Sequence, residues 1–337
     1  MSEPPPLSLP ALAELAGSAR SGVTADHSPF GSTPYLLVDG DDGTLGSVDR
    51  TACTDWIARQ PCPVIILARD PARHDALLDA CDLRLTGIAE ARTPIAHIRN
   101  APFAAMVLVQ VLRATESLPA ETALDIESLA YATLQHGPEF ARWQRNTQRP
   151  ASISGDTDPA LRMARDGDEL HLTLNRPENR NAMSVEMRDA LCEALALVAA
   201  DETLRHVTID GAGDCFSTGG DLAEFGTAPD PATAHGVRCV RLPARLLLHC
   251  AGRVTFRVHG ACIGSGIEVP AFGGRVVATA DSFFQLPEIR FGLIPGAGGC
   301  ISLPRRIGRQ RTAWLALSAR RINARQALAW GLVDAIE

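Results

Sequence analysis

Two short loops of small residues constrain what this chain can fold into more than any other feature of its sequence. The first, STGGD, spans Ser217–Asp221, and the second, GSG, spans Gly264–Gly266. Each loop follows a strand pattern and precedes a helix pattern, and its small residues let the backbone approach another group closely. Strand–loop–helix units of this kind predict a layered α/β fold with largely parallel strands.

Hydrophobic periodicity extends the same alternation along the chain. We expect a helix that Ser184 caps and that runs to about Ala200, and a further helix near 231–250. The expected strands lie at 34–38, 62–68, 169–175, 205–211, 253–260 and 275–280. Between Asn100 and Trp143 the pattern changes to two long helices, the first apolar almost all round and the second amphipathic.

These patterns divide the chain into four parts. We expect residues 1–30 to form a disordered tail and residues 31–150 to form an α/β segment followed by the helical pair. Residues 151–160 are polar and contain Pro, Ser and Gly, which predicts a linker. Residues 161–337 form the second, larger α/β region.

Composition and charge exclude several classes of protein. The net charge is −7 and all 32 basic residues are arginine, so we expect neither a nucleic-acid surface nor lysine Schiff-base chemistry. Any phosphate group would be recognised by arginine or by backbone N–H groups. No apolar run approaches the roughly 18 residues of a membrane helix, and the N-terminal residues lack a secretory pattern. The nine cysteines form no CxxC pair and no metal-ligand spacing with histidine, which predicts reduced thiols, a cytoplasmic location and no bound metal.

Two isolated glutamates are candidates for chemistry. Glu268 lies in GIEVPAF and Glu288 in LPEIRFG, each a single acid among apolar residues. A buried carboxyl group has a raised pKa, which suits proton transfer near neutral pH. N–H groups of the two loops that converge on one oxygen would form an oxyanion hole. Taken singly, each loop also fits a tight turn without a ligand and each glutamate a surface or turn residue; together they favour an active site.

Six segments of the second half resemble the crotonase superfamily, which includes the enoyl-CoA hydratases and isomerases. They are LNRPENRNAMSVEM, FSTGGDLAEF, VHGACIGSGIEV, FFQLPEIRFGLIPGAGG, LPRRIGRQRTAWLAL and ARQALAWGLVDAI, in family order and with family spacing over residues ~165–337. The resemblance implies a crotonase-like spiral of repeated ββα units for residues 161–337. Residues 31–150 resemble the family only faintly.

The resemblance also implies the residues of the site. Gly220 and Ser265 match the two N–H donors of the family's oxyanion hole. Glu268 matches the acid that chiefly activates a water molecule, and Glu288 matches the acid that handles the proton at the α-carbon. Residues matched to substrate binding are Asn175, Arg176, Gly219 and Gly264.

The activity implied by this resemblance is hydration of a 2-enoyl-CoA thioester in fatty acid metabolism, a lyase reaction. It needs no metal and no cofactor other than the coenzyme A of the substrate. An enoyl-CoA isomerase, another reaction through a thioester enolate, and a non-catalytic crotonase-like scaffold stay open. The family pattern further implies a homo-oligomer, a trimer or hexamer, without nucleic-acid or membrane partners.

The sequence departs from the family pattern at several positions. Ser265 stands where the family usually has glycine, and Pro270 lies in the presumed helix after Glu268, where only the first turn tolerates it. The sequence stops at GLVDAIE, where relatives continue into helices over the acyl pocket. We therefore expect helices of residues 100–145 to cover the site instead, as part of a degenerate or permuted crotonase-like module within 31–150.

Overall fold

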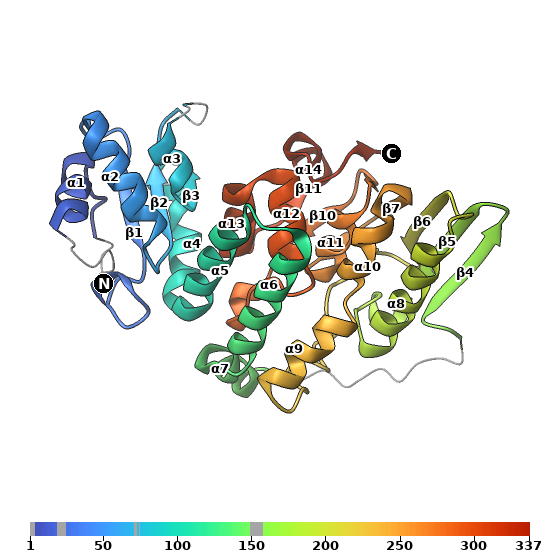
Figure 1. The fold of residues 1–337 in the computed structure, drawn as a ribbon. Helices are drawn as coiled ribbons and strands as arrows, with labels where there is room; N and C mark the ends of the chain where they lie inside the picture. The colour runs from blue at the N-terminus through green and yellow to red at the C-terminus, as the bar shows by residue number, and fades with distance from the viewer. Residues whose placement is uncertain (1–3, 19–24, 71–72, 74, 149–157) are drawn as a thin grey trace.

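The computed structural model describes residues 4–18, 25–70, 73, 75–148 and 158–337. Figure 1 shows a small three-stranded sheet at one end of the molecule, a six-stranded sheet at the other, and helices between them. We call the three parts of the chain the sheet region (residues 4–85), the helical segment (residues 88–146) and the C-terminal core (residues 158–337). The predicted linker at 151–160 lies for the most part outside the described residues.

The sheet region is a parallel sheet between two apolar layers. It contains α1 (Leu9–Ser18), β1 (Leu36–Asp39), α2 (Ser47–Ala58), β2 (Val64–Leu67), α3 (Ala76–Ala80) and β3 (Leu83–Leu85). Both β1 and β3 pair with β2 in parallel. Successive side chains of a strand face opposite ways, so Leu36 and Val38 pack with the helices α1–α3 whereas Leu37 joins the main core of the protein.

The expectation of a disordered tail at residues 1–30 is wrong for the residues described there. Leu7 pairs with Val38 at the edge of β1, and α1 buries Leu9 and Leu12 in the apolar layer beside α2. Leu9 and Leu12 are three residues apart and therefore lie on one face of the helix. The proline and serine content suggested a loose chain, but two buried leucines are enough to dock this short helix.

The helical segment contains four helices. They are α4 (Ile88–Asn100), α5 (Pro102–Thr115), α6 (Ala120–Gln135) and α7 (Pro138–Asn146). The two long helices expected between Asn100 and Trp143 correspond to α5 and α6, and α5 is buried along most of its length as predicted. Pro138 begins the additional helix α7, because proline is favoured in the first turn and disrupts a helix interior.

The C-terminal core contains two sheets and their connecting helices. Its strands are β4 (Leu161–Asp166), β5 (Glu169–Leu174), β6 (His206–Gly211), β7 (Val254–Val258), β8 (Ala261–Ile263), β9 (Arg275–Ala278), β10 (Phe283–Gln285), β11 (Ile322–Asn323) and β12 (Ala335–Ile336). Its helices are α8 (Val185–Ala200), α9 (Pro231–Val240), α10 (Pro243–Cys250), α11 (Ser265–Glu268), α12 (Gly299–Ile307), α13 (Arg309–Ser318) and α14 (Ala324–Trp330). Ser184 caps α8 as predicted, and the helix expected near 231–250 is divided in two before Pro243.

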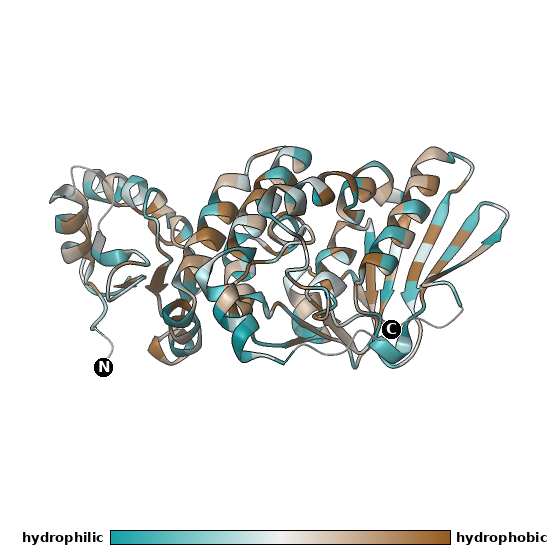
Figure 2. Ribbon diagram, turned by 90° about the horizontal axis from the view of Figure 1, so that it is seen from below, coloured by the Kyte–Doolittle hydropathy of each residue, from teal (hydrophilic) through white to brown (hydrophobic). Residues whose placement is uncertain are grey.

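Strand order confirms the predicted spiral of ββα units. The larger sheet has the order β12-β9-β7-β6-β5-β4 and the smaller one β11-β10-β8. Consecutive strands β7 and β8 enter different sheets and are followed by α11, and β9 and β10 repeat this arrangement before α12. All pairs are parallel except β4 with β5 and β10 with β11. Figure 2 shows hydrophobic and hydrophilic residues alternating along the outer strands of the larger sheet.

One hydrophobic core runs through the helical segment and the C-terminal core. Buried residues of α5 and α6, such as Leu108 and Leu124, belong to the same cluster as Phe256 of β7 and Leu303 of α12. The sheet region adds one face of its sheet to this cluster and keeps a second, smaller core for itself. Packing therefore places the helical segment against the strands and loops of the C-terminal core.

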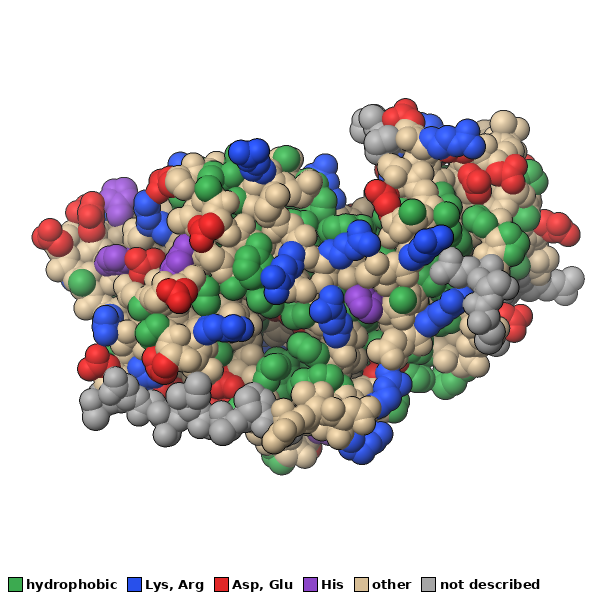
Figure 3. Space-filling view, turned by 180° about the vertical axis from the view of Figure 1, so that it is seen from behind, with side chains coloured by type: hydrophobic (Ala, Val, Ile, Leu, Met, Phe, Trp, Pro, Cys, Tyr) green, Lys and Arg blue, Asp and Glu red, His purple; other side chains and the backbone are tan. Residues whose placement is uncertain are grey.

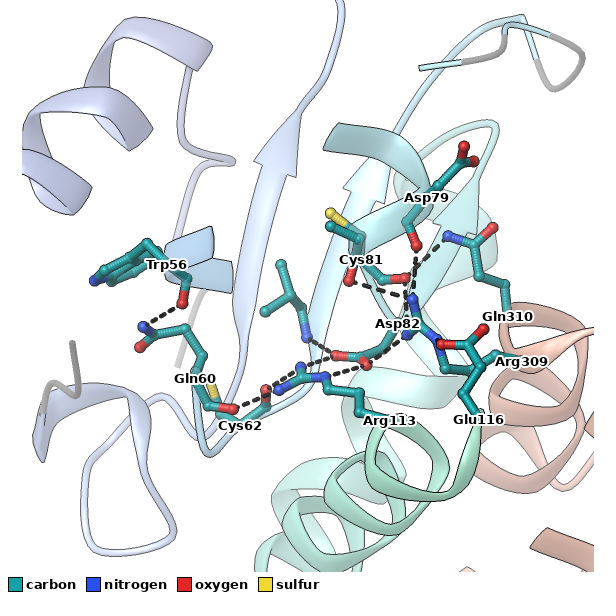
Figure 4. A network of polar contacts seen from close by, with 12 residues as sticks. Trp56, Gln60, Cys62, Asp79, Cys81, Asp82, Arg113, Glu116, Arg309 and Gln310 are labelled. Carbon is teal, nitrogen blue, oxygen red and sulfur yellow. Dashed lines mark hydrogen bonds and ion pairs between the residues drawn. The ribbon is translucent and has the colours of Figure 1, made fainter. Parts of the chain in front are cut away.

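A buried polar network joins the sheet region to both other parts (Figure 4). Asp82, directly before β3, is 1% exposed and forms ion pairs with Arg113 of α5 and Arg309 of α13. The side chain of Asp82 also accepts the N–H of Val64 at 2.8 Å. Gln310 of α13 donates to backbone carbonyls at the end of α3. A single buried carboxylate thus links all three parts of the chain.

Among the described residues, no single helix has the length and apolarity needed to cross a membrane. The pair α4 and α5 passes that test together, but the two helices are bent by 111°.

Candidate active site

The two glycine loops lie backbone against backbone. Ser217 pairs with β8 in a parallel bridge, and a Cβ at Gly219 would lie 2.7 Å from the carbonyl oxygen of Ile263. A Cβ at Gly266 would lie 2.5 Å from the carbonyl oxygen of Ser217. Gly219 and Gly264 also have positive φ angles, +89° and +52°, which side chains disfavour. The contact between the loops therefore requires glycine at these positions.

This packing orients two backbone N–H groups. Met183 donates to the carbonyl of Gly219 and accepts from the N–H of Asp221, so the N–H of Gly220 stays outside the ladder. Ser265 is the first residue of α11, ahead of the first intrahelical bond, so its N–H has no partner within the helix. Both residues line the same cavity.

Two cavities meet at this point. The first, of about 470 Å³, has Gly220, Ser265, Glu268, Glu288 and, from the helical segment, Tyr131 and Gln135 among its lining residues. The second, of about 450 Å³, has Gly219, Gly264, Asn179, Arg180 and Arg290 among its lining residues. Gly220, Phe225 and Glu288 line both cavities. The structure thus brings together six of the eight predicted site residues.

Glu268 is buried at the end of α11 and holds two hydrogen bonds. Its Oε2 accepts the N–H groups of Ala297 at 2.8 Å and Gly299 at 2.9 Å. Burial raises the pKa of Glu268 to about 7, and these N–H groups oppose the rise because they favour the ionised form. The helix stops here, which corrects the expected longer one. Because Pro270 has no N–H to donate, the chain continues as a 3-10 helix from Pro270 to Phe272.

Glu288 is buried in a different environment. It begins the 3-10 helix Glu288–Phe291, and its Oε2 has no hydrogen-bond partner in the described part of the chain. Burial and the charge of Glu268 raise the pKa of Glu288 well above its ordinary value. A Cβ at Gly264 would lie 2.7 Å from Oε1 of Glu288 and 3.9 Å from Oε1 of Glu268. The predicted pair of acids therefore converges beside the second glycine loop.

A third buried carboxylate, Glu127 of α6, was not predicted. It is 1% exposed, and its two oxygens accept the N–H groups of Gly298 and Cys300, each at 2.7 Å. Burial and the charge of Glu268 raise the pKa of Glu127 to about 8. The amphipathic pattern of α6 predicts exposed acids, as Glu121 and Asp125 are. No local signal separates Glu127 from them, because the N–H groups that it binds lie more than 170 residues later.

Aromatic side chains connect the helical segment to the same site. Trp143 of α7 lies 5.0 Å from Phe291 and 6.4 Å from Phe225, measured between ring centroids. A Cβ at Gly296 would lie 2.2 Å from the ring of Tyr131. The helices at 100–145 therefore lie over the two acids. Their origin in a degenerate or permuted crotonase-like module stays a hypothesis.

Asn175 and Arg176 do not join this site, which corrects their expected role in substrate binding. Both are buried and line neither cavity. The guanidinium group of Arg176 donates to the carbonyls of Asn175 and Asp158 and to the carboxylate of Glu186. These bonds tie the start of the loop after β5 to the segment before β4 and to α8, and the following residues Asn179 and Arg180 reach the cavity instead.

No group of three or more His, Cys, Asp or Glu side chains in the described residues is arranged to hold a metal ion. Eight of the nine cysteines are buried and all nine are unpaired.

The chain is similar to a set of enzymes that act on coenzyme A thioesters. It is 36% identical over 168 residues to 1,2-epoxyphenylacetyl-CoA isomerase of Escherichia coli, covering 49% of this chain and 64% of that protein. It is 36% identical over 165 residues to 2,3-dehydroadipyl-CoA hydratase of the same organism, with the same two coverages. The chain therefore spans just under two thirds of the length of these relatives.

Parts of two solved structures are also similar to this chain. The enoyl-CoA hydratase of Thermoplasma volcanium is 30% identical, with a TM-score of 0.48 over 53% of this chain and 72% of that one. The enoyl-CoA hydratase of Mycobacterium smegmatis is 31% identical, with a TM-score of 0.48 over 53% of this chain and 70% of that one. The family model for enoyl-CoA hydratase/isomerase matches residues 169–337, just over half of the chain. The chain thus belongs to the enoyl-CoA hydratase/isomerase family, within the crotonase superfamily.

Proposed function

We propose that this protein hydrates a 2-enoyl-CoA thioester, adding water across its α,β double bond. The observation that carries the proposal is the difference between two buried carboxyl groups in one cavity. Glu268 accepts two N–H groups, whereas Oε2 of Glu288 is buried without a partner among the described residues. Two acids whose surroundings separate their proton affinities are suited to act as a base and an acid in the same reaction.

The assignment of roles follows from these surroundings. The N–H groups of Ala297 and Gly299 stabilise the ionised form of Glu268, which would act as the base that takes a proton from water. Burial and the charge of Glu268 raise the pKa of Glu288 well above its ordinary value and so favour its protonated form, which would deliver a proton to the α-carbon. The water oxygen bonds to the β-carbon, and the reaction consumes no electrons. It therefore needs no redox cofactor.

Gly220 and Ser265 would stabilise the negative charge that develops on the thioester oxygen. Their N–H groups lie outside the backbone pairing of their loops and line the same cavity as the two acids. Donors that are already in place cost no reorganisation during the reaction, and each is worth about 10²–10³-fold in rate. The hydroxyl group of Ser265 is also buried and has no hydrogen-bond partner among the described residues.

The second cavity suits the coenzyme A part of the substrate. Arg180 and Arg290 line it. The sequence contains no lysine, so arginine is the side chain of permanent positive charge that can bind phosphate groups. Figure 3 shows basic side chains across the middle of one face of the molecule and acidic ones mainly toward its ends. A polyanionic nucleotide is the ligand that this distribution favours.

We also keep the prediction of a trimer or hexamer. Light scattering on the purified protein tests it.

The test is turnover of short and medium 2-enoyl-CoA substrates, followed by loss of the conjugated absorbance. We expect Glu268→Gln and Glu288→Gln each to lower kcat by about 10²–10⁴-fold. Acyl-CoA binding, measured by calorimetry, should stay within a few-fold of the wild-type value. Glu193→Gln, a change at a 73% exposed carboxylate on α8, is the matched control and should leave kcat unchanged.

Three outcomes would contradict the proposal. Conversion of a 3-enoyl-CoA without hydration of the 2-enoyl-CoA would identify an isomerase. Acyl-CoA binding without turnover of either compound would identify a non-catalytic scaffold. Full activity of Glu268→Gln would remove that residue from the role of base.

A further inference from the structure

The residues around the start of α12, 297–300, offer four consecutive N–H groups to two carboxylates. Glu268 binds those of Ala297 and Gly299, and Glu127 binds those of Gly298 and Cys300, at distances of 2.7–2.9 Å. Successive N–H groups are therefore taken alternately by one acid and then the other. The two carboxylates hold one stretch of backbone in common.

The conformation of this stretch is tightly restricted. Gly298 has φ of +100°, which favours glycine, and a Cβ there would lie 2.4 Å from the ring of Phe272. A Cβ at Gly299 would lie 2.6 Å from Cγ of Glu268. A shift of the backbone at Gly298 or Cys300 would therefore displace the neighbouring N–H groups that Glu268 accepts.

Glu127 is supplied by a part of the chain that the family model does not cover. The model begins at residue 169, and Glu127 lies on α6 of the helical segment. Both oxygens of its carboxylate are used by the segment 297–300, and its side chain reaches neither cavity lining. It therefore acts on the site through the backbone that it shares with Glu268.

We propose that Glu127 is a positioning residue of the active site, which holds the segment 297–300 so that Ala297 and Gly299 orient the carboxylate of Glu268. This inference rests on the proposed hydration, in which Glu268 is the base. It gives the helical segment a functional role in addition to packing: α6 completes the hydrogen-bonding shell of a catalytic group located in the C-terminal core.

The charges around Glu127 give this role a measurable signature. Glu268 of α11 and Glu288 face it as like charges, and the Cys300 thiol of α12 lies beside it. Arg238 of α9 is the cation that acts on Glu268. Glu127 has the higher pKa of the two and is largely protonated while Glu268 titrates, so the loss of its charge alone leaves that titration in place. Displacement of the segment 297–300 would take the N–H groups of Ala297 and Gly299 away from Glu268 and so raise its pKa, because these groups favour the ionised form.

The experiment compares Glu127→Gln, Glu127→Asp and the wild type across pH 5–9. For Glu127→Gln we expect kcat to fall by about 10²-fold, because a small displacement of a catalytic group is costly, with KM changed less than threefold. The acid limb of the kcat profile should move to higher pH, because Glu268 loses N–H groups that favour its ionised form. Glu127→Asp keeps the carboxyl group but shortens its reach, so it should move that limb in the same direction by less. Glu121→Gln, at an exposed acid of the same helix, is the control and should match the wild type.

A second readout does not depend on activity. The titration of Glu268 is followed by carbon-13 NMR of glutamate carboxyl groups, assigned with Glu268→Gln. A higher titration midpoint for Glu268 in Glu127→Gln than in the wild type supports the proposal, and an equal or lower midpoint overturns it, as do equal kcat values and profiles. If Glu127→Gln is not recovered folded, Glu127→Asp is compared with the wild type. A kcat of Glu127→Asp equal to that of the wild type overturns the positioning role. A wild-type protein that turns over no 2-enoyl-CoA contradicts the proposed function, and the NMR titration still decides on Glu127.

Discussion

The sheet region and the helical segment both precede the family domain in the chain, yet they meet it in different ways. The sheet region contributes one face of its sheet and the ion pairs of Asp82. The helical segment contributes Tyr131 and Gln135 to a cavity and Glu127 to the backbone that Glu268 binds. Among the described residues, those that line the two cavities begin at Tyr131. The difference indicates that one neighbour stabilises the C-terminal core while the other also completes its site.

The largest effect that tests this difference is expected at Asp82. Asp82→Ala takes the buried carboxylate away from Arg113 and Arg309, which are 13% and 8% exposed, and leaves Arg309 only the exposed Glu116 as an ion-pair partner among the described residues. Breaking a buried pair in this way costs about 3–5 kcal/mol of unfolding free energy, measured by urea denaturation. We expect kcat per folded molecule to stay at the wild-type value. Asp79→Ala, at an exposed carboxylate nearby, should change stability by less than about 0.5 kcal/mol. A large loss of kcat in Asp82→Ala would show that the sheet region also shapes the site.

An intermediate effect is expected from pH, and it arises on the side of the helical segment. Burial raises the pKa of Glu127 to about 8 and that of Glu268 to about 7, from an ordinary 4.5. Between pH 4.5 and 8 the folded protein therefore binds protons that the unfolded chain has released, so the contribution of these groups to stability falls as pH rises. The stability of the wild type relative to Glu127→Gln should decline by on the order of 2 kcal/mol from pH 5.5 to pH 8. Denaturation curves at the two pH values measure it, and a relative stability that rises with pH would contradict the assignment.

The smallest effect is expected at Glu139 of α7. Its carboxylate accepts the N–H groups of Phe103 and Ala104 in the first turn of α5, and its Cβ would lie 2.5 Å from a Cβ at Gly292, directly after the helix of Glu288. Glu139→Ala should lower the unfolding free energy by about 1–2 kcal/mol, as loss of a helix cap does, and should also lower kcat. Thermal unfolding and the hydration assay measure the two effects, with Glu121→Ala as the control. An unchanged kcat would show that the packing of α7 does not determine the position of Glu288.

Much of the site could be predicted from the sequence, because its parts lie in short local patterns. The glycine loops mark the points of close backbone approach, and Glu268 and Glu288 stand out as single acids in apolar segments. The start of α8 at Ser184 was predicted because serine is a favoured residue at a helix N-cap. The strands β8 and β10 were missed, since three residues carry too little periodicity to identify them, and α1 was missed because the proline and serine around it suggested a loose chain.

Asn175 and Arg176 show a different limit. Family position alone suggested that they bind substrate, whereas in the structure their side chains donate to backbone carbonyls of Pro159 and Asp158, before β4. Only the fold shows which polar side chains are already hydrogen-bonded and which still face a cavity.

The sequence by itself determined the α/β class of this protein, its family, its two glycine loops and its pair of isolated acids. These features depend on residue identity within a few positions of one another. The tertiary structure alone decided that α6 brings Glu127 to the N–H groups of Gly298 and Cys300. Hydrogen bonds between residues so distant in the chain form only when packing offsets the loss of chain entropy on bringing them together. No local sequence pattern can therefore predict them.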